Sequence, residues 1–268
     1  MPQLSVGEYS LVYNMFSFTF AAMLASFVYF VLIRGQVAPE YRNALTMSSL
    51  VVVVAGYHYF RIFQSWEAAY VLENGVYVAS GKPFNDAYRY IDWLLTVPLL
   101  VAELVAVMKL DAKRTFSLSV RLAGAAALMV ILGYPGEIAA DTGTRALWGA
   151  ISTVPFVYIL FVLFTELGGA MKNQPDQARI LIRNIRYLLL ATWGFYPIVY
   201  LFPILGIGGA GTAGIAAGTL VLVQVGYCIA DVAAKCGYGV MIYWIARAKT
   251  EADGWSPAQA ALSPASGD

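Results

Sequence analysis

The sequence predicts an all-α membrane protein, a bundle of seven transmembrane helices with a short extracellular β-hairpin between the second and third helices. Composition gives the first two observations, because 60% of the 268 residues are hydrophobic and only 12% are charged. A soluble domain carries roughly 25% charged residues, about twice that fraction. The third observation is a series of seven apolar segments, each of about 20 residues, the length that a helix needs to cross a bilayer.

Each apolar segment is predicted to form one helix. The segments cover residues 9–33, 44–66, 87–108, 117–138, 145–167, 180–205 and 214–246. The connection between the second and third segments contains Asn74-Gly75, a dipeptide that favours a two-residue hairpin turn. The triplets 70–72 and 76–78 beside it consist of Val, Tyr and Leu and are expected to be the two strands.

Basic residues gather at one end of the predicted helices. They are Arg34, Arg42, Lys109, Lys113, Arg114, Lys172, Arg179, Arg183, Arg186, Arg247 and Lys249. Because loops rich in Lys and Arg stay in the cytoplasm, we expect a multi-pass plasma-membrane protein with its N-terminus and hairpin extracellular and its C-terminus cytoplasmic. Residues 1–249 are expected to form one domain in the lipid bilayer. Residues 250–268, rich in Ala, Ser, Pro and Gly, are expected to be a disordered tail.

Composition and motif context argue against several functions. A net charge of +1 gives no electrostatic reason to bind nucleic acid. One histidine and two cysteines are too few for a Cys/His metal site. The GIGGAG stretch at 206–211 matches the glycine pattern of dinucleotide-binding proteins, but here it joins two membrane helices. We therefore expect transport or signalling rather than enzymatic catalysis.

Lys235 is the most informative residue, because it stands in the middle of the last apolar segment. A charged side chain inside a membrane is costly and usually marks a functional site. Asp231, four residues earlier, lies on the same helix face and can balance the charge. A lysine in an apolar site beside an acidic group can form a Schiff base with an aldehyde. The aldehyde that suits a membrane interior is retinal.

The third predicted helix carries Arg89, Asp92, Thr96 and Glu103 near one face. The stretch from Asp92 to Glu103 spans roughly 16 Å, about half of the hydrocarbon thickness. One carboxyl is thus expected toward the outside and one toward the cytoplasm, as in a proton path. Arg89 and Asp92 are also spaced for a structural ion pair. Glu103 has no basic residue one turn away, so it is expected to be a neutral acid that can donate a proton.

The second predicted helix contributes His58, the single histidine of the chain. It lies at a depth where it can meet Asp92 and tune its proton affinity near neutral pH. A packing histidine that is hydrogen-bonded within the membrane is the alternative. Trp93, Trp193 and Tyr196 lie deep in their segments, so a place in the aromatic belt at the membrane interface is not expected for them.

Three motifs together identify a family: RYIDWLLTVPLL in the third segment, WGFYP in the sixth and DVAAK in the seventh. With them the chain resembles the microbial rhodopsins along nearly its full length. The combination of Asp92, Thr96 and Glu103, with His58 in addition, is similar to that of the proteorhodopsin and xanthorhodopsin outward proton pumps. The resemblance implies a light-driven outward proton pump that binds all-trans retinal and assembles into pentamers or trimers.

The resemblance also implies a role for each matching residue. Lys235 would carry retinal as a protonated Schiff base, with Asp92 as counterion and primary proton acceptor and Asp231 as second counterion. Glu103 would return a proton from the cytoplasmic side, and Arg89 would lie on the exit side. The remaining implied residues are Thr96, near the counterion, and the pocket residues Trp93, Leu100, Trp193, Tyr196, Pro197 and Tyr200.

Two features depart from the haloarchaeal pumps. Those pumps release the proton outward through two glutamates, and the matching positions here are Leu205 and Val223, so that release route is not expected. Gly149 stands where they carry a bulky tryptophan. In xanthorhodopsin-like pumps a glycine here opens a window for a carotenoid antenna, although a small residue also permits close helix packing. Leu100 matches a position where leucine accompanies green absorption.

Other functions remain as alternatives. A sensory photoreceptor that signals to a partner would share Lys235 and the pocket but would not need Glu103. A sodium pump would have Asn, Asp and Gln in place of Asp92, Thr96 and Glu103, and an inward chloride pump would lack the carboxylate of Asp92. A transporter that does not use light would have no need for a retinal pocket.

Overall fold

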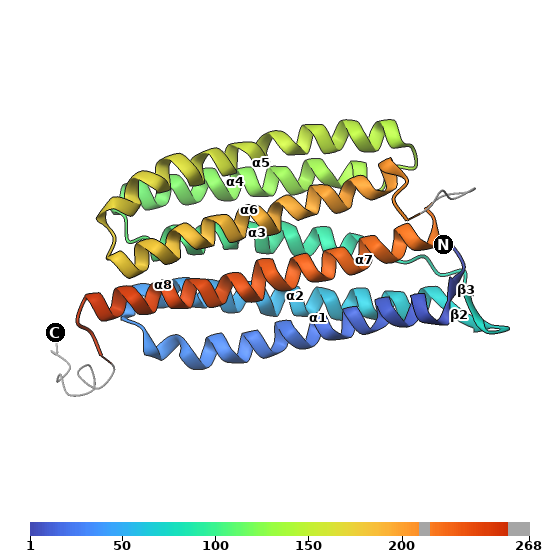
Figure 1. The fold of residues 1–268 in the computed structure, drawn as a ribbon, viewed down its shortest axis with the longest axis horizontal. Coiled ribbons are helices and arrows are strands. Elements are labelled where there is room, and N and C mark those ends of the chain that lie inside the picture. Colours follow the sequence, from blue (N-terminus) through green and yellow to red (C-terminus); the bar gives the residue numbers. More distant parts are fainter. Residues whose placement is uncertain (209–214, 257–268) are drawn as a thin grey trace.

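Seven helical spans run side by side in the computed structural model, which describes residues 1–208 and 215–256 (Figure 1). The first six are α1 (Val6–Ile33), α2 (Arg42–Ala69), α3 (Ala87–Val107), α4 (Ala112–Glu137), α5 (Thr142–Ala170) and α6 (Asp176–Leu205). The seventh consists of α7 (Ala217–Asp231), the π-helical segment η4 (Val232–Gly237) and α8 (Tyr238–Ala252). Short 3-10 turns are η1 (Arg34–Gln36), η2 (Pro39–Tyr41) and η3 (Met171–Asn173). The predicted seven-helix fold is confirmed.

Several helices begin before their apolar stretches because polar caps start them. Ser5 caps α1, accepting a bond from the backbone N–H of Glu8 at 3.2 Å, while the Glu8 carboxylate accepts the Ser5 N–H at 2.8 Å. Asp111 and Asp141 cap α4 and α5, each accepting a bond from the backbone N–H three residues later at 2.9 and 2.7 Å. A polar first turn adds nothing to an apolar segment, so hydrophobicity alone places these starts too late.

A small antiparallel sheet lies beyond one end of the bundle. Strands β2 (Tyr70–Glu73) and β3 (Val76–Ala79) form the predicted hairpin. Its turn residues Asn74 and Gly75 have φ of 48° and 82°, the left-handed conformation that a tight hairpin turn requires. Strand β1 (Leu4–Ser5) was not predicted, because two residues show no alternation; it pairs with β3 and gives the order β1-β3-β2. We call this the hairpin end of the bundle and the opposite one the C-terminal end.

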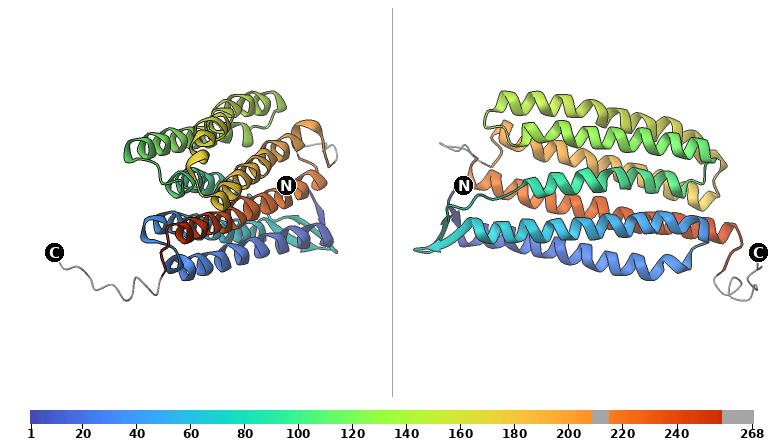
Figure 2. Two further views of the ribbon diagram at one scale, coloured as in Figure 1. Left: turned by 60° about the vertical axis from the view of Figure 1, so that its left-hand side comes forward. Right: turned by 180° about the vertical axis from the view of Figure 1, so that it is seen from behind.

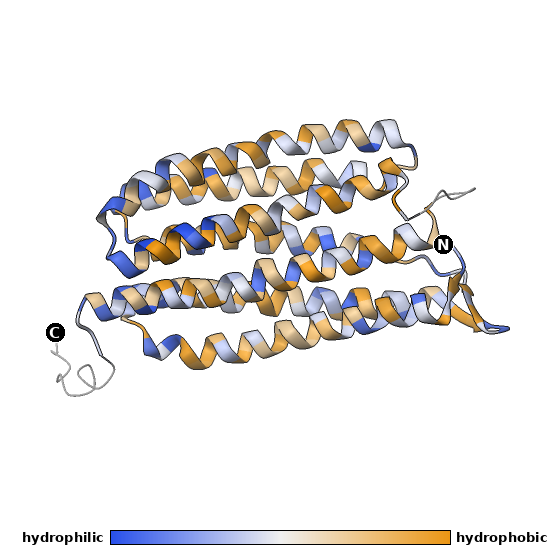
Figure 3. Ribbon diagram, in the orientation of Figure 1, coloured by the Kyte–Doolittle hydropathy of each residue, from blue (hydrophilic) through white to orange (hydrophobic). Residues whose placement is uncertain are grey.

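The helices form a closed bundle. Each of α1 to α5 packs against the next in the chain, and the seventh span packs against both α1 and α6 (Figure 2). Buried apolar residues fill the interior, while many large apolar side chains of α1, α4, α5 and α6 face outward. Apolar colours dominate the outer helices, and hydrophilic residues increase toward the C-terminal end of the bundle, where α5 ends and α6 begins (Figure 3). This surface suits a lipid bilayer.

The seventh span differs from its prediction in two ways. It is not one regular α-helix, because η4 inserts a wider π-helical turn that contains Lys235. It also extends to Ala252, so residues 250–252 are helical and are not the beginning of a disordered tail. Residues 257–268 of the predicted tail and residues 209–211 of the GIGGAG stretch lie outside the described residues.

Candidate functional site

Lys235 occupies the centre of the bundle between two carboxylates. Its Nζ lies 2.9 Å from Oδ2 of Asp92 in α3 and 2.6 Å from Oδ1 of Asp231 at the end of α7. All three side chains are at most 1% exposed. A buried lysine is tolerated only when opposite charges and hydrogen bonds compensate its burial. Two ionised carboxylates and one ammonium leave a formal charge of −1, so the group has room for one more proton.

The two carboxylates are not equivalent. Asp231 accepts hydrogen bonds from the hydroxyls of Tyr59, at 2.6 Å, and Tyr196, and from the indole N–H of Trp93 at 3.1 Å. Three donors stabilise an ionised carboxylate. Within the described residues no group hydrogen-bonds Oδ1 of Asp92, which is buried. An additional proton is therefore best accommodated on Asp92.

Three predicted neighbours of Asp92 bond elsewhere. The hydroxyl of Thr96 donates to the backbone carbonyl of Asp92 at 2.8 Å, not to its carboxylate. Nδ1 of His58 lies 2.9 Å from the carbonyl of Val54 one turn earlier in α2, and no hydrogen bond joins His58 to Asp92 in the described chain. Arg89 forms no ion pair with Asp92, so the structural-pair alternative for these two residues is wrong; its partner is Asp86, at 2.7 Å.

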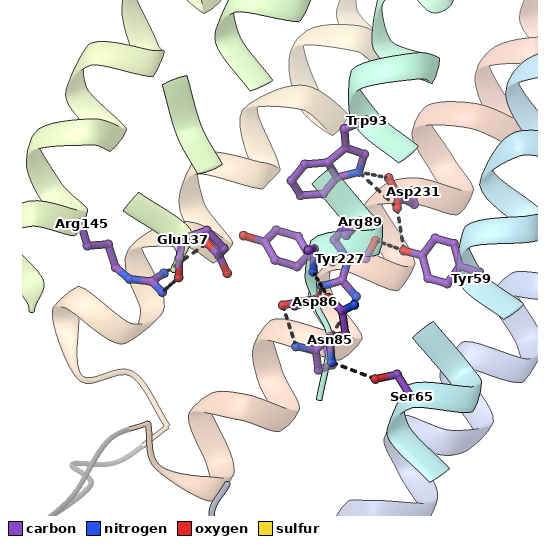
Figure 4. Close-up of polar contacts among 12 residues, drawn as sticks. Tyr59, Ser65, Asn85, Asp86, Arg89, Trp93, Glu137, Arg145, Tyr227 and Asp231 are labelled. Carbon is purple, nitrogen blue, oxygen red and sulfur yellow. Dashed lines mark hydrogen bonds and ion pairs between the residues drawn. The ribbon is translucent and has the colours of Figure 1, made fainter. Parts of the chain in front are cut away.

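Arg89 belongs to a polar network at the hairpin end (Figure 4). It also donates to the side-chain carbonyl of Gln224 at 2.8 Å, and its guanidinium lies 4.8 Å from the centre of the Tyr227 ring. Across from Tyr227, Glu137 of α4 pairs with Arg145 of α5 at 3.2 Å, both largely buried. A series of charged and polar groups thus leads from Lys235 toward the hairpin end.

Glu103 lies in the other half of α3, toward the C-terminal end, and is fully buried. Its Oε2 accepts a hydrogen bond from the hydroxyl of Ser48 in α2 at 2.6 Å. No group of the described chain bonds its Oε1, and no basic side chain pairs with it there. A carboxyl in this setting is best accommodated as the neutral acid, as predicted from the sequence.

An apolar cavity of about 360 Å³ adjoins Lys235. Aromatic side chains from α3, α5, α6 and α7 line it, and the predicted pocket residues all belong to its lining. These lining residues are Trp93, Leu100, Trp193, Tyr196, Pro197 and Tyr200, with Lys235 itself. Predominantly apolar and aromatic walls with one reactive polar group are typical of a pocket for an organic cofactor.

The cavity extends to the outer surface between α5 and α6. Gly149 lines it, and its other lining residues there include Ala146, Ala150, Thr153 and Leu201, which are exposed on the outside of the bundle. A Cβ atom on Gly149 would lie 2.7 Å from Cε1 of Tyr200. The lack of a side chain at position 149 therefore also leaves room for the Tyr200 ring.

Sequence reasoning missed several residues of the site. Ser48, Tyr59 and Gln224 contact Glu103, Asp231 and Arg89 from other helices, and one sequence does not show which helix faces meet. Small and polar residues are common in membrane helices, so these residues gave no distinct signal. Glu137 could have been noticed, because it is an acidic residue at the end of an apolar segment, followed eight residues later by a basic one.

Comparison with known proteins identifies the family. Residues 11–249 match the bacteriorhodopsin-like proteins. The chain belongs to the bacteriorhodopsin-like family. The predicted resemblance to the microbial rhodopsins is thereby confirmed.

Individual relatives of this bacteriorhodopsin-like protein cover most of its length. The green-light absorbing proteorhodopsin of Gamma-proteobacterium EBAC31A08 is 30% identical over 229 residues, which are 84% of this chain and 82% of that protein. Archaerhodopsin-2 of Halobacterium sp. (strain aus-2) is 28% identical over 225 residues, 84% and 80% of the two chains. The crystal structure of xanthorhodopsin, described as a light-driven ion pump with dual chromophore, is 56% identical, with a TM-score of 0.89 over 96% of this chain and 100% of that one. A thermophilic rhodopsin is 50% identical, with a TM-score of 0.88 over 95% and 100%.

Proposed function

We propose that this protein is a light-driven outward proton pump that binds all-trans retinal on Lys235. Its membership of the bacteriorhodopsin-like family and its likeness to xanthorhodopsin support this function. The observation that carries it is the inequivalence of the two carboxylates at Lys235. Asp231 is held as the anion by three donors, while Asp92 keeps one buried oxygen free for a proton.

The cavity fits a retinal chain attached to Lys235. It is apolar and aromatic, which suits a polyene, and the lysine amine is among its lining residues. Trp93, Trp193, Tyr196 and Pro197 would hold the chain, with Leu100 on the same wall. Retinal supplies the absorption of light and the isomerisation that changes the surroundings of the attached nitrogen. Everything else in the cycle is done by groups of the protein.

The residues then move one proton outward. Asp92, 2.9 Å from Nζ of Lys235, takes the proton that this nitrogen holds in the dark. Asp231 remains ionised and stabilises the positive charge at Nζ before the transfer and again once Nζ has regained a proton. Glu103, the neutral acid held by Ser48, returns a proton to Nζ and is itself reprotonated from the C-terminal end. The proton on Asp92 leaves past Arg89 toward the hairpin end.

The direction of transport follows from the proposed orientation. The excess of Lys and Arg at the C-terminal end supports a cytoplasmic location for that end and an extracellular one for the hairpin. Protons then travel from the cytoplasm to the outside across the plasma membrane. The pentamers or trimers expected from the family resemblance stay part of the proposal.

The deciding test is the pH of an unbuffered suspension of cells that express the chain with added all-trans retinal. Green light should acidify the medium, and a protonophore should abolish the change. Asp92→Asn should bind retinal, absorb further to the red and pump nothing, since it has no carboxylate to take the proton. Transport by Asp92→Asn would contradict the proposal. So would a coloured Lys235→Ala or a colourless wild type.

The donor role of Glu103 has its own test. Glu103→Gln should slow the return of the proton to Lys235 after a flash and leave the dark colour nearly unchanged. Flash photolysis measures that rate directly. A coloured protein whose illumination leaves the pH constant would instead favour the sensory photoreceptor, in which Glu103 has no task.

The lateral opening beside Gly149 supports an additional carotenoid antenna. An apolar cavity that reaches the lipid-facing surface lets a second chromophore approach the retinal site. We expect that a C40 carotenoid added to membranes extends the action spectrum of pumping and that Gly149→Trp removes this extension. Gly169→Trp, on the same helix but in open space, is the control. An unchanged action spectrum for the wild type with each of a panel of carotenoids would reject the antenna.

A further inference from the structure

Lys249 is a buried lysine that the proton path described above does not use. It lies in α8, is 4% exposed, and its Nζ donates to the backbone carbonyl of Val107 at 2.8 Å. Val107 follows Glu103 by four residues, one helical turn or about 6 Å along α3. The ammonium of Lys249 is thus held more than one turn beyond Glu103, toward the C-terminal end.

Contacts between the seventh span and α3 fix this placement along the axis. The hydroxyl of Tyr238 at the start of α8 donates to the carbonyl of Leu100 at 3.1 Å. Eleven residues later Lys249 reaches Val107. Glu103 lies between these two points of α3. The position of the Lys249 charge relative to Glu103 therefore depends on two anchored ends of α8, not on one flexible side chain.

The ammonium of Lys249 has no carboxylate partner in the described part of the chain. The nearby acids are engaged with another cation, since Lys109 pairs with both Glu40 and Asp253, the latter at 3.5 Å. The centre of the Tyr41 ring lies 5.1 Å from Nζ of Lys249 and 5.7 Å from that of Lys109. An aromatic face and a carbonyl at a helix C-terminus both stabilise an ammonium, and they offset part of the cost of burying Lys249.

A cavity of about 420 Å³ at the C-terminal end reaches Lys249. Its lining is mixed in charge and comes from the ends of several helices. The charged lining residues are Lys109, Asp111, Arg114, Lys249 and Asp253. Lys249 is the most buried of them. The cavity thus reaches the ammonium of Lys249, which is the charged group of this lining that bonds α3 nearest to Glu103.

We propose that Lys249 is a positioning residue for the proton donor, whose charge stabilises the carboxylate of Glu103 during the interval between donation and recovery. The inference rests on the proposed function, because Glu103 must become ionised for Lys249 to act. A cation on the same side of the anion, separated from it by a poorly solvated interior, lowers the free energy of the anion even from beyond one helical turn. It therefore speeds the loss of the proton from Glu103 and slows its return.

The opposite effects on proton loss and proton return distinguish this proposal from a purely structural role of Lys249. Lys249 also caps the C-terminus of α3, and a cap is needed for helix stability whatever its charge. Loss of a cap would loosen the fold and give no reason for the two proton steps to change in opposite directions. Loss of the charge alone should slow donation and speed recovery.

Lys249→Gln makes the distinction, because glutamine keeps an N–H donor for the Val107 carbonyl and lacks the charge. Time-resolved infrared spectroscopy follows the carboxyl band of Glu103, and flash photolysis follows the nitrogen of Lys235. Lys249→Gln should slow donation by roughly three- to tenfold and speed recovery of the Glu103 band. Lys249→Arg, which keeps the positive charge, should leave both rates close to those of the wild type. Lys109→Met, which removes an exposed and paired ammonium from the same cavity, should change neither.

Several results would overturn the proposal. Unchanged rates in Lys249→Gln, changes in the same direction, or an equal effect of Lys109→Met would each do so. So would failure of both Lys249→Gln and Lys249→Met to form pigment while Lys249→Arg forms it, since the lysine would then be required for folding. Glu103→Gln is measured in parallel. If it leaves donation fast, the proposed donor is wrong; if it slows donation and Lys249→Gln does not, only the role of Lys249 is wrong.

Discussion

Two aspartates face the same lysine, and their hydrogen-bond partners decide what each can do. Asp231 is surrounded by Tyr59, Tyr196 and Trp93, whose hydrogen bonds are stronger to an ionised carboxylate than to a protonated one, and protonation would displace a donor from the oxygen that takes the proton. An unpaired buried donor costs about 1–3 kcal/mol. Asp92 bonds Lys235 through one oxygen only. Protonation therefore disturbs fewer interactions at Asp92 than at Asp231.

Ser48→Ala tests the hydrogen bond that holds Glu103. The substitution leaves both carboxyl oxygens of Glu103 without a side-chain partner, so we expect a loss of about 1–3 kcal/mol in stability. Thermal unfolding of the pigment measures this loss. The carboxyl band of Glu103 in the dark infrared spectrum should move to higher frequency, because its hydrogen bond is gone.

Ser49→Ala is the matched control for this prediction. Ser49 is the next residue and is also buried, but within residues 1–208 and 215–256 its hydroxyl bonds only the carbonyl of Leu45 in its own helix, at 2.9 Å. Its replacement should leave the Glu103 band in place. Equal band shifts in the two variants would show that the Ser48 bond is not formed.

The charged residues of the site could be predicted from the sequence, and their partners could not. Lys235, Asp92, Asp231 and Glu103 stand out because a charge in an apolar segment is rare and costly. Their roles in transport stay predictions until measured. Tyr59 carries no such signal, because its importance comes from facing Asp231 across two helices. Likewise, the sequence indicated how deep His58 lies in the membrane but not that its Nδ1 faces the carbonyl of Val54.

At the scale of helices, length and composition were enough to predict every span but not its internal geometry. The π-helical segment η4 has no distinct sequence pattern; the residues VAAKCG read as ordinary helix. The structure shows this segment, which contains Lys235, and the Lys235 side chain lines the cavity. π-helical turns inside helices often coincide with functional sites, and here one sets the direction of the lysine.

Gly239→Ala tests the packing of α8 against α1. A Cβ at Gly239 would collide with the ring of Phe30, which is fully buried. Because the ring has no free space to move into, the variant should lose about 1–3 kcal/mol of stability. The midpoint of thermal bleaching reports the loss.

Gly237→Ala provides the comparison two residues earlier. Apart from its own helix backbone, no described part of the chain lies within 4 Å of the added Cβ at that position. Alanine also favours a helix over glycine by about 0.5–1 kcal/mol. Gly237→Ala should therefore keep or raise the bleaching temperature. A similar fall for both glycines would mean that the Phe30 contact is not the cause.

For the whole molecule, the arrangement of both ends predicts the orientation in the membrane. The hairpin end carries few basic residues and the C-terminal end carries many, which supports an extracellular hairpin. The two native cysteines are buried, so an introduced cysteine can be labelled selectively. Lys82→Cys at the hairpin end should react with a membrane-impermeant maleimide on intact cells, whereas Lys172→Cys should react only after lysis. Both positions are exposed. The reverse labelling pattern would mean that the protein has the opposite orientation, and hence that protons move in the opposite direction.

The π-helical segment has a consequence for comparing sequences. A π-helical turn holds about one residue more than an α-helical turn, so η4 takes up one additional residue between α7 and α8. If the same sequence were a regular α-helix, that residue would turn α8 by about 100° around the axis. Tyr238 would then miss the carbonyl of Leu100, and Lys249 would miss that of Val107. The π-helical turn thus lets one span present Lys235 to the cavity and still bond α3. An alignment with a rhodopsin whose seventh span lacks this segment needs a one-residue gap there. Without that gap, every residue after Lys235 is aligned with the wrong residue of the other chain.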